Sequence, residues 1–105
     1  MSAMSDYLEN EILDHILSTG AFTMPSNVYV GLSTGSFGDD NSGTELTGNN
    51  YSRVSASFSA ASGGTTSNSG ALEFAAATGS WGSVTHFGIF DASSSGNLLI
   101  HGAFS

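Results

Sequence analysis

VTHFGIFDASSSGNLLIHGAF, residues 84–104, carries the strongest strand pattern in the sequence. Two apolar runs, 84–90 and 97–104, flank six residues of turn-forming composition at 91–96. Apolar runs separated by a short stretch of Asp, Ser and Gly are typical of two antiparallel strands joined by a turn. We therefore expect a β-hairpin at this end of the chain.

Two histidines of this hairpin are candidate metal ligands. If the turn closes symmetrically, Phe90 lies opposite Asn97 and His86 lies opposite His101. Histidines that face each other across two strands could bind a divalent metal ion. The alternative is a pair of partly buried side chains with local hydrogen bonds, and a slip of one residue would place them on opposite faces. We expect no bound metal here.

Alternating apolar residues predict further strands upstream of the hairpin. The alternation covers residues 28–32 and 51–58, and Leu72, Phe74 and Ala76 repeat it. A period of two is typical of a strand with one buried face. Together with the hairpin this gives about five strands, so we expect a mainly β chain that forms a small antiparallel sandwich or barrel. Polar, Gly-rich loops are expected at residues 33–50 and 62–70.

The N-terminal segment predicts one amphipathic helix. Its apolar residues recur on one face of a 3.6-residue period, and they are Leu8, Ile12, Leu13, Ile16 and Leu17. Ser5 or Asp6 can cap the start of the helix, and Gly20 is the expected left-handed residue after its end. We expect one domain, with the helix and its connector at residues 1–24 and the β-structure at 25–105.

Composition restricts the partners of this chain. It has 105 residues and a formal charge of −8, and it contains one Lys or Arg against nine Asp and Glu. Binding to phosphate backbones and to anionic lipids depends on clustered Lys and Arg, so we expect neither nucleic acid nor a membrane as a partner. The chain has no cysteine, which removes disulfides and thiolate metal sites.

Small side chains make the expected core thin. Alanines such as Ala56, Ala76 and Ala103 occupy predicted strand positions, and each buries much less apolar area than Leu or Phe. Sheet edges and apolar surface then have to be covered by other subunits. We therefore expect a homo-oligomer, most simply a trimer.

The acidic loop at residues 39–45 is a second candidate metal site. Asp39, Asn41 and Glu45 place oxygen ligands around Gly43, as in half of a calcium-binding loop. The third acid and the distant bidentate Glu of an EF-hand are missing from it. Asp, Asn and Gly are also the residues that a solvated tight turn favours. We expect a turn here, with no calcium and no cofactor.

Three aromatic residues could form a carbohydrate platform. Trp81, Tyr51 and Tyr29 lie near Ser, Thr and Asn residues, and aromatic faces stack on sugar rings. The alternative places Trp81 in the core as its largest side chain. No Gly-x-Ser-x-Gly nucleophile elbow in a strand-to-helix context is expected, so we expect no enzymatic activity.

Most of the chain resembles a family of small tailed-bacteriophage proteins, usually labelled phage tail fibre protein or minor tail protein. The stretches that carry the resemblance are SDYLENEILDHILSTGAFTMPSNVYVGL (5–32), GTELTGNNYSRV (43–54) and WGSVTHFGIFDASSSGNLLIHGAFS (81–105). The resemblance implies a structural component of the virion without enzymatic activity. Members of that family often continue past the strand at 98–104 into further β-structure, whereas this sequence stops at Ser105, so we expect an open outer edge on the hairpin.

The resemblance and the composition together predict a role in the virion, with assembly in the host cytoplasm. The expected role is docking on the particle surface, as a capsid decoration or cement protein or as a small tail accessory protein. The apolar helix face would contact either the chain's own core or a neighbouring virion protein. The alternative is a fibre-type adhesin that binds host glycans through Trp81, Tyr51 and Tyr29.

Overall fold

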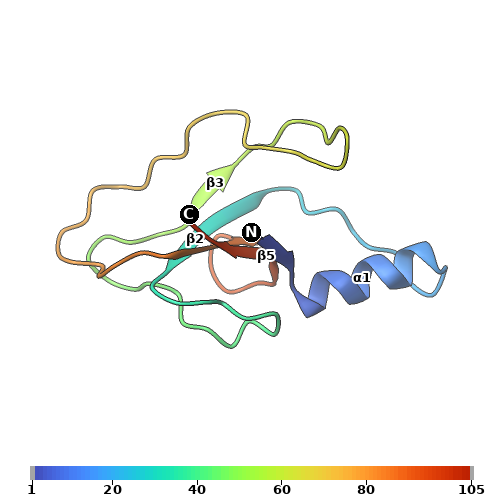
Figure 1. Ribbon diagram of the computed structural model, residues 1–105, viewed down its shortest axis with the longest axis horizontal. Helices are drawn as coiled ribbons and strands as arrows, with labels where there is room; N and C mark the ends of the chain where they lie inside the picture. Colours follow the sequence, from blue (N-terminus) through green and yellow to red (C-terminus); the bar gives the residue numbers. More distant parts are fainter. Residues whose placement is uncertain (1, 105) are drawn as a thin grey trace.

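The computed structural model describes residues 2–104 as one antiparallel sheet with a helix between its first two strands in the sequence (Figure 1). The helix α1 spans Asp6–Ile16. The strands are β1 (Ser2–Met4), β2 (Val28–Ser33), β3 (Val54–Ala56), β4 (His86–Phe90) and β5 (Leu98–Ala103). Their order in the sheet is β1-β5-β4-β2-β3. The mainly β, antiparallel class is confirmed, and all five strands lie in one sheet where a sandwich would have two.

The hairpin forms as predicted, but its register differs. His86 pairs with Ala103 and His101 pairs with Gly88, so the predicted opposition of the two histidines is wrong. The Asp91 carboxylate accepts a hydrogen bond from the Asn97 backbone N–H at 2.7 Å, which closes the turn one residue later than symmetry suggests. A bulge beside Phe90 then shifts the pairing by one residue more.

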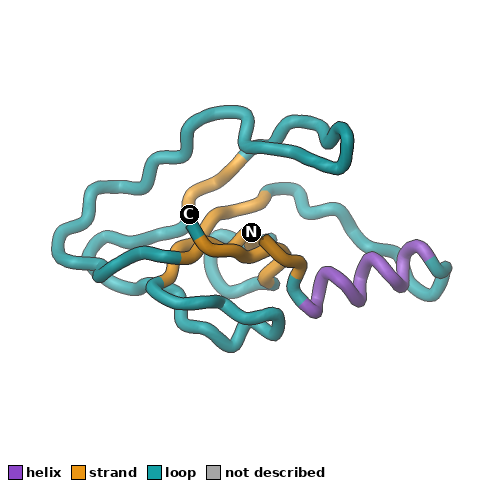
Figure 2. The backbone as a smooth tube through the Cα atoms, viewed as in Figure 1, coloured by secondary structure: helices purple, strands orange, loops and turns teal. Residues whose placement is uncertain are grey.

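The remaining strand predictions are only partly confirmed. Strand β2 forms as expected, and the 51–58 strand is reduced to β3. No strand forms around Leu72, Phe74 and Ala76, so this prediction is wrong. The segment is hydrogen-bonded to the loop between β2 and β3 and not to a strand, since Asn50 Nδ2 donates to the Ala76 carbonyl at 2.9 Å. Figure 2 shows how much of the chain is loop.

Residues 57–72, which we call the arm, lead away from β3. Backbone hydrogen bonds join Ser59 to Ser67 and Ser57 to Ser69. Gly63 and Gly64 both have positive φ angles, as the tight turn of a two-residue hairpin requires. The stretch expected to be a loop therefore contains a short hairpin.

The outer edge of the hairpin is paired rather than open. Strand β1 was not predicted, and it pairs with β5 from Ser2, opposite Gly102, to Met4, opposite Ile100. Ser5 then donates a backbone hydrogen bond to the Leu99 carbonyl at 2.8 Å. The expectation of an open edge on the hairpin is wrong over these residues, because the N-terminal strand β1 pairs with β5 there.

The helix begins at the predicted cap and ends earlier than predicted. The Ser5 side chain accepts a hydrogen bond from the Leu8 N–H at 3.2 Å and donates one to the Leu98 carbonyl, which fixes the start of α1 against β5. At the other end Ser18, with φ at 65°, takes the left-handed position that was expected at Gly20. Thr19 N–H then bonds to the Asp14 carbonyl at 2.8 Å, as in a Schellman cap.

The most deeply buried cluster of the core lies on one face of the sheet and consists of Phe37, Phe90 and Leu98, each at most 2% exposed. Other buried apolar side chains, Leu8, Val30 and Leu99 among them, line the opposite face and are 6–8% exposed. Phe37 comes from the loop between β2 and β3, which folds across this face, and its ring contacts Phe90 edge to face at 5.5 Å. A Cβ on Gly88 would lie 2.9–3.1 Å from all three side chains, so the absence of a side chain there allows the loop to approach. We call this side of the sheet the core face.

Candidate functional site

The opposite face of the sheet is apolar and carries an open cavity of about 650 Å³. One row of apolar residues crosses all five strands on this side. Strand pairing sets its order as Met4, Ile100, Ile89, Val30 and Val54. Successive side chains of a strand point to opposite faces, so these residues cannot join Phe90 and Leu98 in the core.

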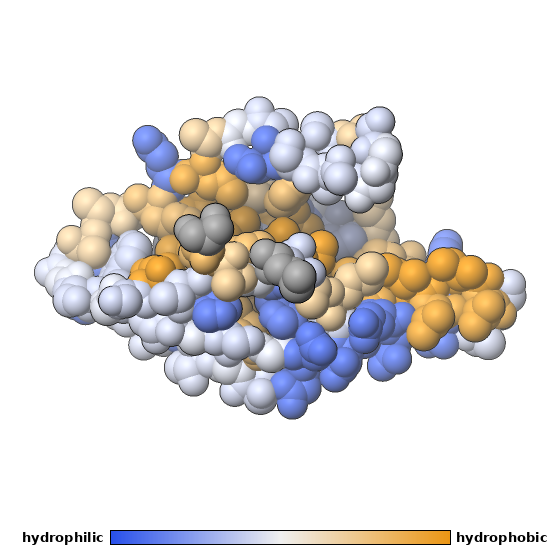
Figure 3. Space-filling model, in the orientation of Figure 1, coloured by the Kyte–Doolittle hydropathy of each residue, from blue (hydrophilic) through white to orange (hydrophobic). Residues whose placement is uncertain are grey.

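The walls of the cavity come from segments on either side of the sheet. The first turn of α1 and its connector contribute Leu8, Phe22 and Pro25, and the arm contributes Phe58 and Leu72. Figure 3 shows hydrophobic residues in the hollow beneath the arm. The cavity is therefore a groove with an apolar sheet as its floor and a loop or helix along each side.

The predicted helix stripe continues this apolar surface away from the sheet. Leu8 is buried at the cavity and Ile12 is half-buried, whereas Leu13, Ile16 and Leu17 are 55%, 67% and 66% exposed. Only the beginning of α1 lies near the sheet, and the rest extends outward (Figure 1). The stripe therefore does not pack in the chain's own core. We call the cavity and this stripe together the docking surface.

Charge is distributed unevenly around the docking surface. None of the residues that line the cavity is charged. On α1, Asp6, Glu9 and Asp14 are exposed, and Figure 3 shows hydrophilic residues below the hydrophobic ridge of the helix. The surface has an apolar centre with acidic side chains beside it, which is the usual arrangement of a protein interface with a polar rim.

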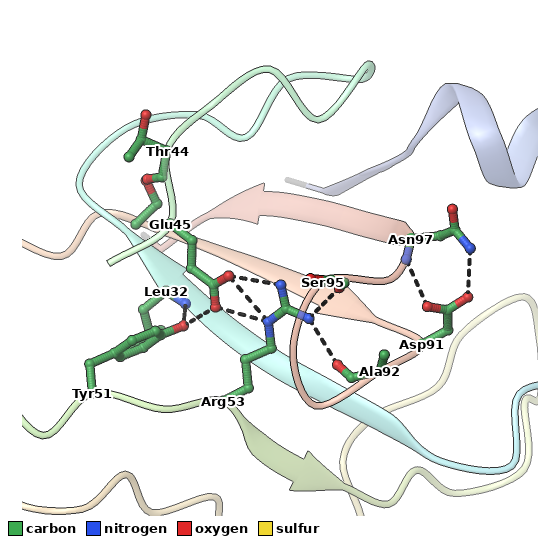
Figure 4. A network of polar contacts seen from close by, with 10 residues as sticks. Leu32, Thr44, Glu45, Tyr51, Arg53, Asp91, Ala92, Ser95 and Asn97 are labelled. Carbon is green, nitrogen blue, oxygen red and sulfur yellow. Dashed lines mark hydrogen bonds and ion pairs between the residues drawn. The ribbon is translucent and has the colours of Figure 1, made fainter. Parts of the chain in front are cut away.

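An ion pair holds the loops on the core face (Figure 4). The Arg53 guanidinium donates to both carboxylate oxygens of Glu45 at 2.8–3.2 Å and to the Ala92 and Ser95 carbonyls at 2.8 Å. The side chains of Arg53 and Glu45 are 7% and 22% exposed. One side chain thus ties the β2–β3 loop to the hairpin turn.

Space for this network depends on Gly31. A Cβ at that position would lie 2.6 Å from the Glu45 carboxylate and 3.0 Å from the Tyr51 hydroxyl. The Arg53 guanidinium lies 3.6 Å from the centre of the Phe90 ring, where a cation interacts favourably with the aromatic face. The network is therefore continuous with the core, and its role is structural.

Tyr51 completes the network as a donor. Its hydroxyl donates to the Glu45 carboxylate and accepts from the Leu32 N–H at 2.9 Å. Burial, followed by the hydrogen bond to Glu45, raises the pKa of Tyr51 well above its usual value of 10.0. The neutral hydroxyl is thus the form that the folded protein stabilises.

Tyr51→Phe is expected to lower the free energy of unfolding by about 1–3 kcal/mol, because it removes one hydrogen bond to Glu45, which keeps Arg53, and leaves the Leu32 N–H without its acceptor. The contribution of Tyr51 should be complete below pH 10 and should be lost as the pH rises above 10, since the unfolded chain ionises first. Urea unfolding between pH 8 and pH 11 measures both effects.

Tyr29→Phe is the control for this prediction, because Tyr29 is half-buried like Tyr51 but takes no part in the network around Glu45. Equal losses of stability in the two variants would contradict the role assigned to the Tyr51 hydroxyl. So would a loss of stability above pH 10 that is as large in Tyr51→Phe as in the unaltered protein.

The predicted metal candidates lie in separate hydrogen-bonded pairs. His101 Nε2 is 2.7 Å from an Asp39 carboxylate oxygen, and His86 Nδ1 is 2.7 Å from the Thr85 hydroxyl. Glu45 faces Arg53 across the core face. Within residues 2–104, no three His, Asp or Glu side chains gather as a metal site.

The acidic loop forms turns within itself. Asn41 has φ at 58° and donates its N–H to the Gly38 carbonyl at 3.1 Å. The Asp40 carboxylate accepts from Ser42, and these hydrogen bonds lower the pKa of Asp40. This is the arrangement of a solvated turn, which was the alternative to a calcium loop.

The predicted aromatic candidates are only partly brought together. Trp81 and Tyr51 contact each other edge to face at 5.7 Å, and Tyr51 stacks on Phe74 at 6.2 Å. The Trp81 indole N–H donates to the Asn49 carbonyl at 3.0 Å. Tyr29 lies on β2 beside Phe90 and takes no part in this cluster. Trp81 is half-buried, so it is not a central core residue.

Most of the docking surface was not predicted from the sequence. Phe22 reaches the cavity from a segment that has no helical or strand period. The sequence pattern assigns Phe58 and Leu72 to strands, but the structure places both on the arm beside the cavity. A signal was nevertheless present in β4, where Phe87 and Ile89 alternate with Phe90. Apolar residues at both alternating positions indicate a strand with both faces covered.

No helix within residues 2–104 has the length and apolar character that a membrane span requires. Comparison with curated proteins gave no match. The family model described as Podophage GP4 fiber I protein gp80 matches residues 3–105. This match includes the helix, all of the sheet except its first residue, and the docking surface. The chain therefore belongs to the family of the Podophage GP4 fiber I protein gp80, a family of phage fibre-type virion proteins.

Proposed function

We propose that this virion protein is non-enzymatic and docks on other virion proteins at the particle surface, as a small tail accessory or capsid decoration protein. The family description, a fiber protein, favours the tail. Docking would proceed through the docking surface defined above, after synthesis in the host cytoplasm. The protein would bridge neighbouring virion proteins and so add contacts between them.

One observation carries this proposal. The chain covers the apolar row from Met4 to Val54 only in part, since Val30 is buried, Ile100, Ile89 and Val54 are half-buried and Met4 is exposed, and it leaves the end of the helix stripe exposed. Met4, Leu13, Ile16 and Leu17 are each at least 46% exposed. Leaving apolar area of this kind in water costs about 25 cal/mol for each Å² that a partner could bury. Large exposed apolar patches with a polar rim mark interaction sites.

The test is binding to phage particles that lack this protein. Purified protein is mixed with such particles, and the bound fraction is measured by cosedimentation. The double variant Leu13→Gln/Ile16→Gln should bind at least tenfold more weakly, because two exposed apolar contacts are lost without a change of charge.

Ala75→Gln/Ala77→Gln is the matched control, since both alanines are exposed outside the docking surface. It should bind like the unaltered protein. Absence of binding by the unaltered protein, or equal binding by the two double variants, would contradict the proposal.

A homo-oligomer, most simply a trimer, remains part of the proposal. The single sheet has a three-residue strand at each edge, so both edges present little backbone for strand pairing between copies. Contacts between copies would use side-chain surfaces instead. Light scattering of the purified protein tests this point, and a monomeric mass at all concentrations would contradict it.

A glycan-binding adhesin is the second candidate function. Its support is the half-buried cluster of Trp81, Tyr51 and Phe74, since aromatic faces can stack on sugars. The Trp81 N–H and the Tyr51 hydroxyl, however, are already bonded within the chain. Glycan-array binding that Trp81→Ala abolishes without a change in Tm would favour the adhesin, and a lower Tm without array binding would favour a structural Trp81.

A further inference from the structure

We propose that the docking surface receives an apolar segment flanked by Lys or Arg side chains from another virion protein, and not a second copy of this chain. This inference rests on the proposed function and names the chemistry of the partner. It follows from where the charges of the chain lie.

The chain offers no free Lys or Arg to a partner. Arg53 is the only Lys or Arg in the sequence. Its side chain is 7% exposed and is bonded to Glu45 and to two carbonyls on the core face. Moving it to an interface would leave the Glu45 carboxylate partly buried and unpaired, which is costly.

The acidic side chains lie beside the exposed part of the docking surface. Glu9 precedes Leu13 by one helical turn, and Asp14 precedes Leu17 by three residues, so both carboxylates neighbour the apolar stripe on α1. Both are exposed. A partner that covers Leu13 and Leu17 therefore has to approach two negative charges.

A second copy cannot neutralise these charges. Each copy has a formal charge of −8, so an interface formed by two stripes, or by a stripe and a cavity, would bring acidic helices together without a Lys or Arg between them. Like charges at an interface disfavour the wrong partner. A segment with Lys or Arg on either side of its apolar residues would cover the apolar surface and also pair with the acidic side chains beside it. Any trimer of this chain would therefore form through other surfaces.

The cavity fits side chains of such a segment. Its volume of about 650 Å³ is open to one side, and its floor of Val30, Phe87, Ile89 and Ile100 is uncharged. Apolar side chains that repeat along a partner helix can enter a groove of this kind while its polar face remains outside. The partner therefore contributes apolar residues to the groove and cations to the helix beside it.

Photocrosslinking identifies the segment directly. A photoreactive phenylalanine analogue replaces Phe87 in the cavity floor, and the protein is bound to particles that lack it and irradiated. The crosslinked peptide, read by mass spectrometry, should come from another virion protein and carry Lys or Arg beside apolar residues. A crosslink to a second copy, or to a segment without Lys or Arg, would overturn the inference. The same analogue at position 77 controls for random contact.

The charge requirement has its own test. Glu9→Gln/Asp14→Asn should bind the particles about fivefold more weakly at low salt, because two rim ion pairs of modest strength are lost. Its affinity should also fall less steeply with salt than that of the unaltered protein. Asp40→Asn removes an exposed carboxylate from the loop on the core face and should have no effect.

The outcomes separate the two proposals. If the unaltered protein does not bind particles, the proposed function fails. If it binds, but Glu9→Gln/Asp14→Asn binds equally well with the same salt dependence, only the basic partner is overturned.

Discussion

Arg53→Met is expected to lower the free energy of unfolding by about 3–5 kcal/mol, because it leaves a largely buried carboxylate without its partner. Glu45 would lose its bidentate ion pair, and the Ala92 and Ser95 carbonyls would lose their donors. The ring of Phe90 would lose the guanidinium above it. Domains of this size have about 5–15 kcal/mol of stability in total, so a large part would be lost. Urea unfolding followed by circular dichroism measures the change.

Two further variants show whether the loss comes from the unpaired carboxylate. Glu45→Gln/Arg53→Met removes both charges and should cost less than the sum of the two single changes, since each single change leaves one buried charge unpaired and the double variant leaves none. Arg53→Lys keeps the charge but lacks the planar fork that reaches Glu45 and two carbonyls together, so its loss should be intermediate. A change below 1 kcal/mol for Arg53→Met would contradict the role of the network.

Phe37→Ala is expected to cost about 3–5 kcal/mol, as is usual when a buried aromatic side chain is removed from a core. Phe37 is 1% exposed and belongs to the three-residue core with Phe90 and Leu98. Its loss leaves a cavity between the β2–β3 loop and the sheet. The loop also carries Asp39, which pairs with His101, and we expect this contact to loosen as well. Thermal and urea unfolding measure the loss of stability.

Phe58→Ala is the matched control, because it makes the same chemical change in another loop. Phe58 lies on the arm and is 38% exposed, so its removal should cost about 1 kcal/mol or less. Equal losses in the two variants would mean that the core face is not the main source of stability. Hydrogen exchange should show faster exchange along the β2–β3 loop in Phe37→Ala only.

Local patterns predicted the helix and the hairpin correctly. The stripe from Leu8 to Leu17 and the cap at Ser5 depend on neighbours in the sequence, and so does the turn between β4 and β5. The end of the helix was less well predicted, since Ser18 took the left-handed position expected at Gly20. Either residue can end a helix, and the surrounding hydrogen bonds decide which does.

Strand pairing was harder to predict, because it depends on residues far apart in the sequence. The Asp91 side chain and the bulge beside Phe90 set the hairpin register, and with it the separation of His86 from His101. Strand β1 is three residues long and has no alternating pattern, yet it pairs with β5. The segment around Phe74 has the alternating pattern but pairs with no strand.

Composition and local patterns were enough to predict the mainly β class, the amphipathic helix, the acidic charge and the resemblance to phage fibre-type proteins. Which apolar residues are most deeply buried and which line the docking surface depends on the folded chain. A period of two assigns Phe90 and Ile89 to opposite faces, but it does not say which face a loop will cover. Phe37 covers one face from a polar loop, and the other face carries the apolar cavity.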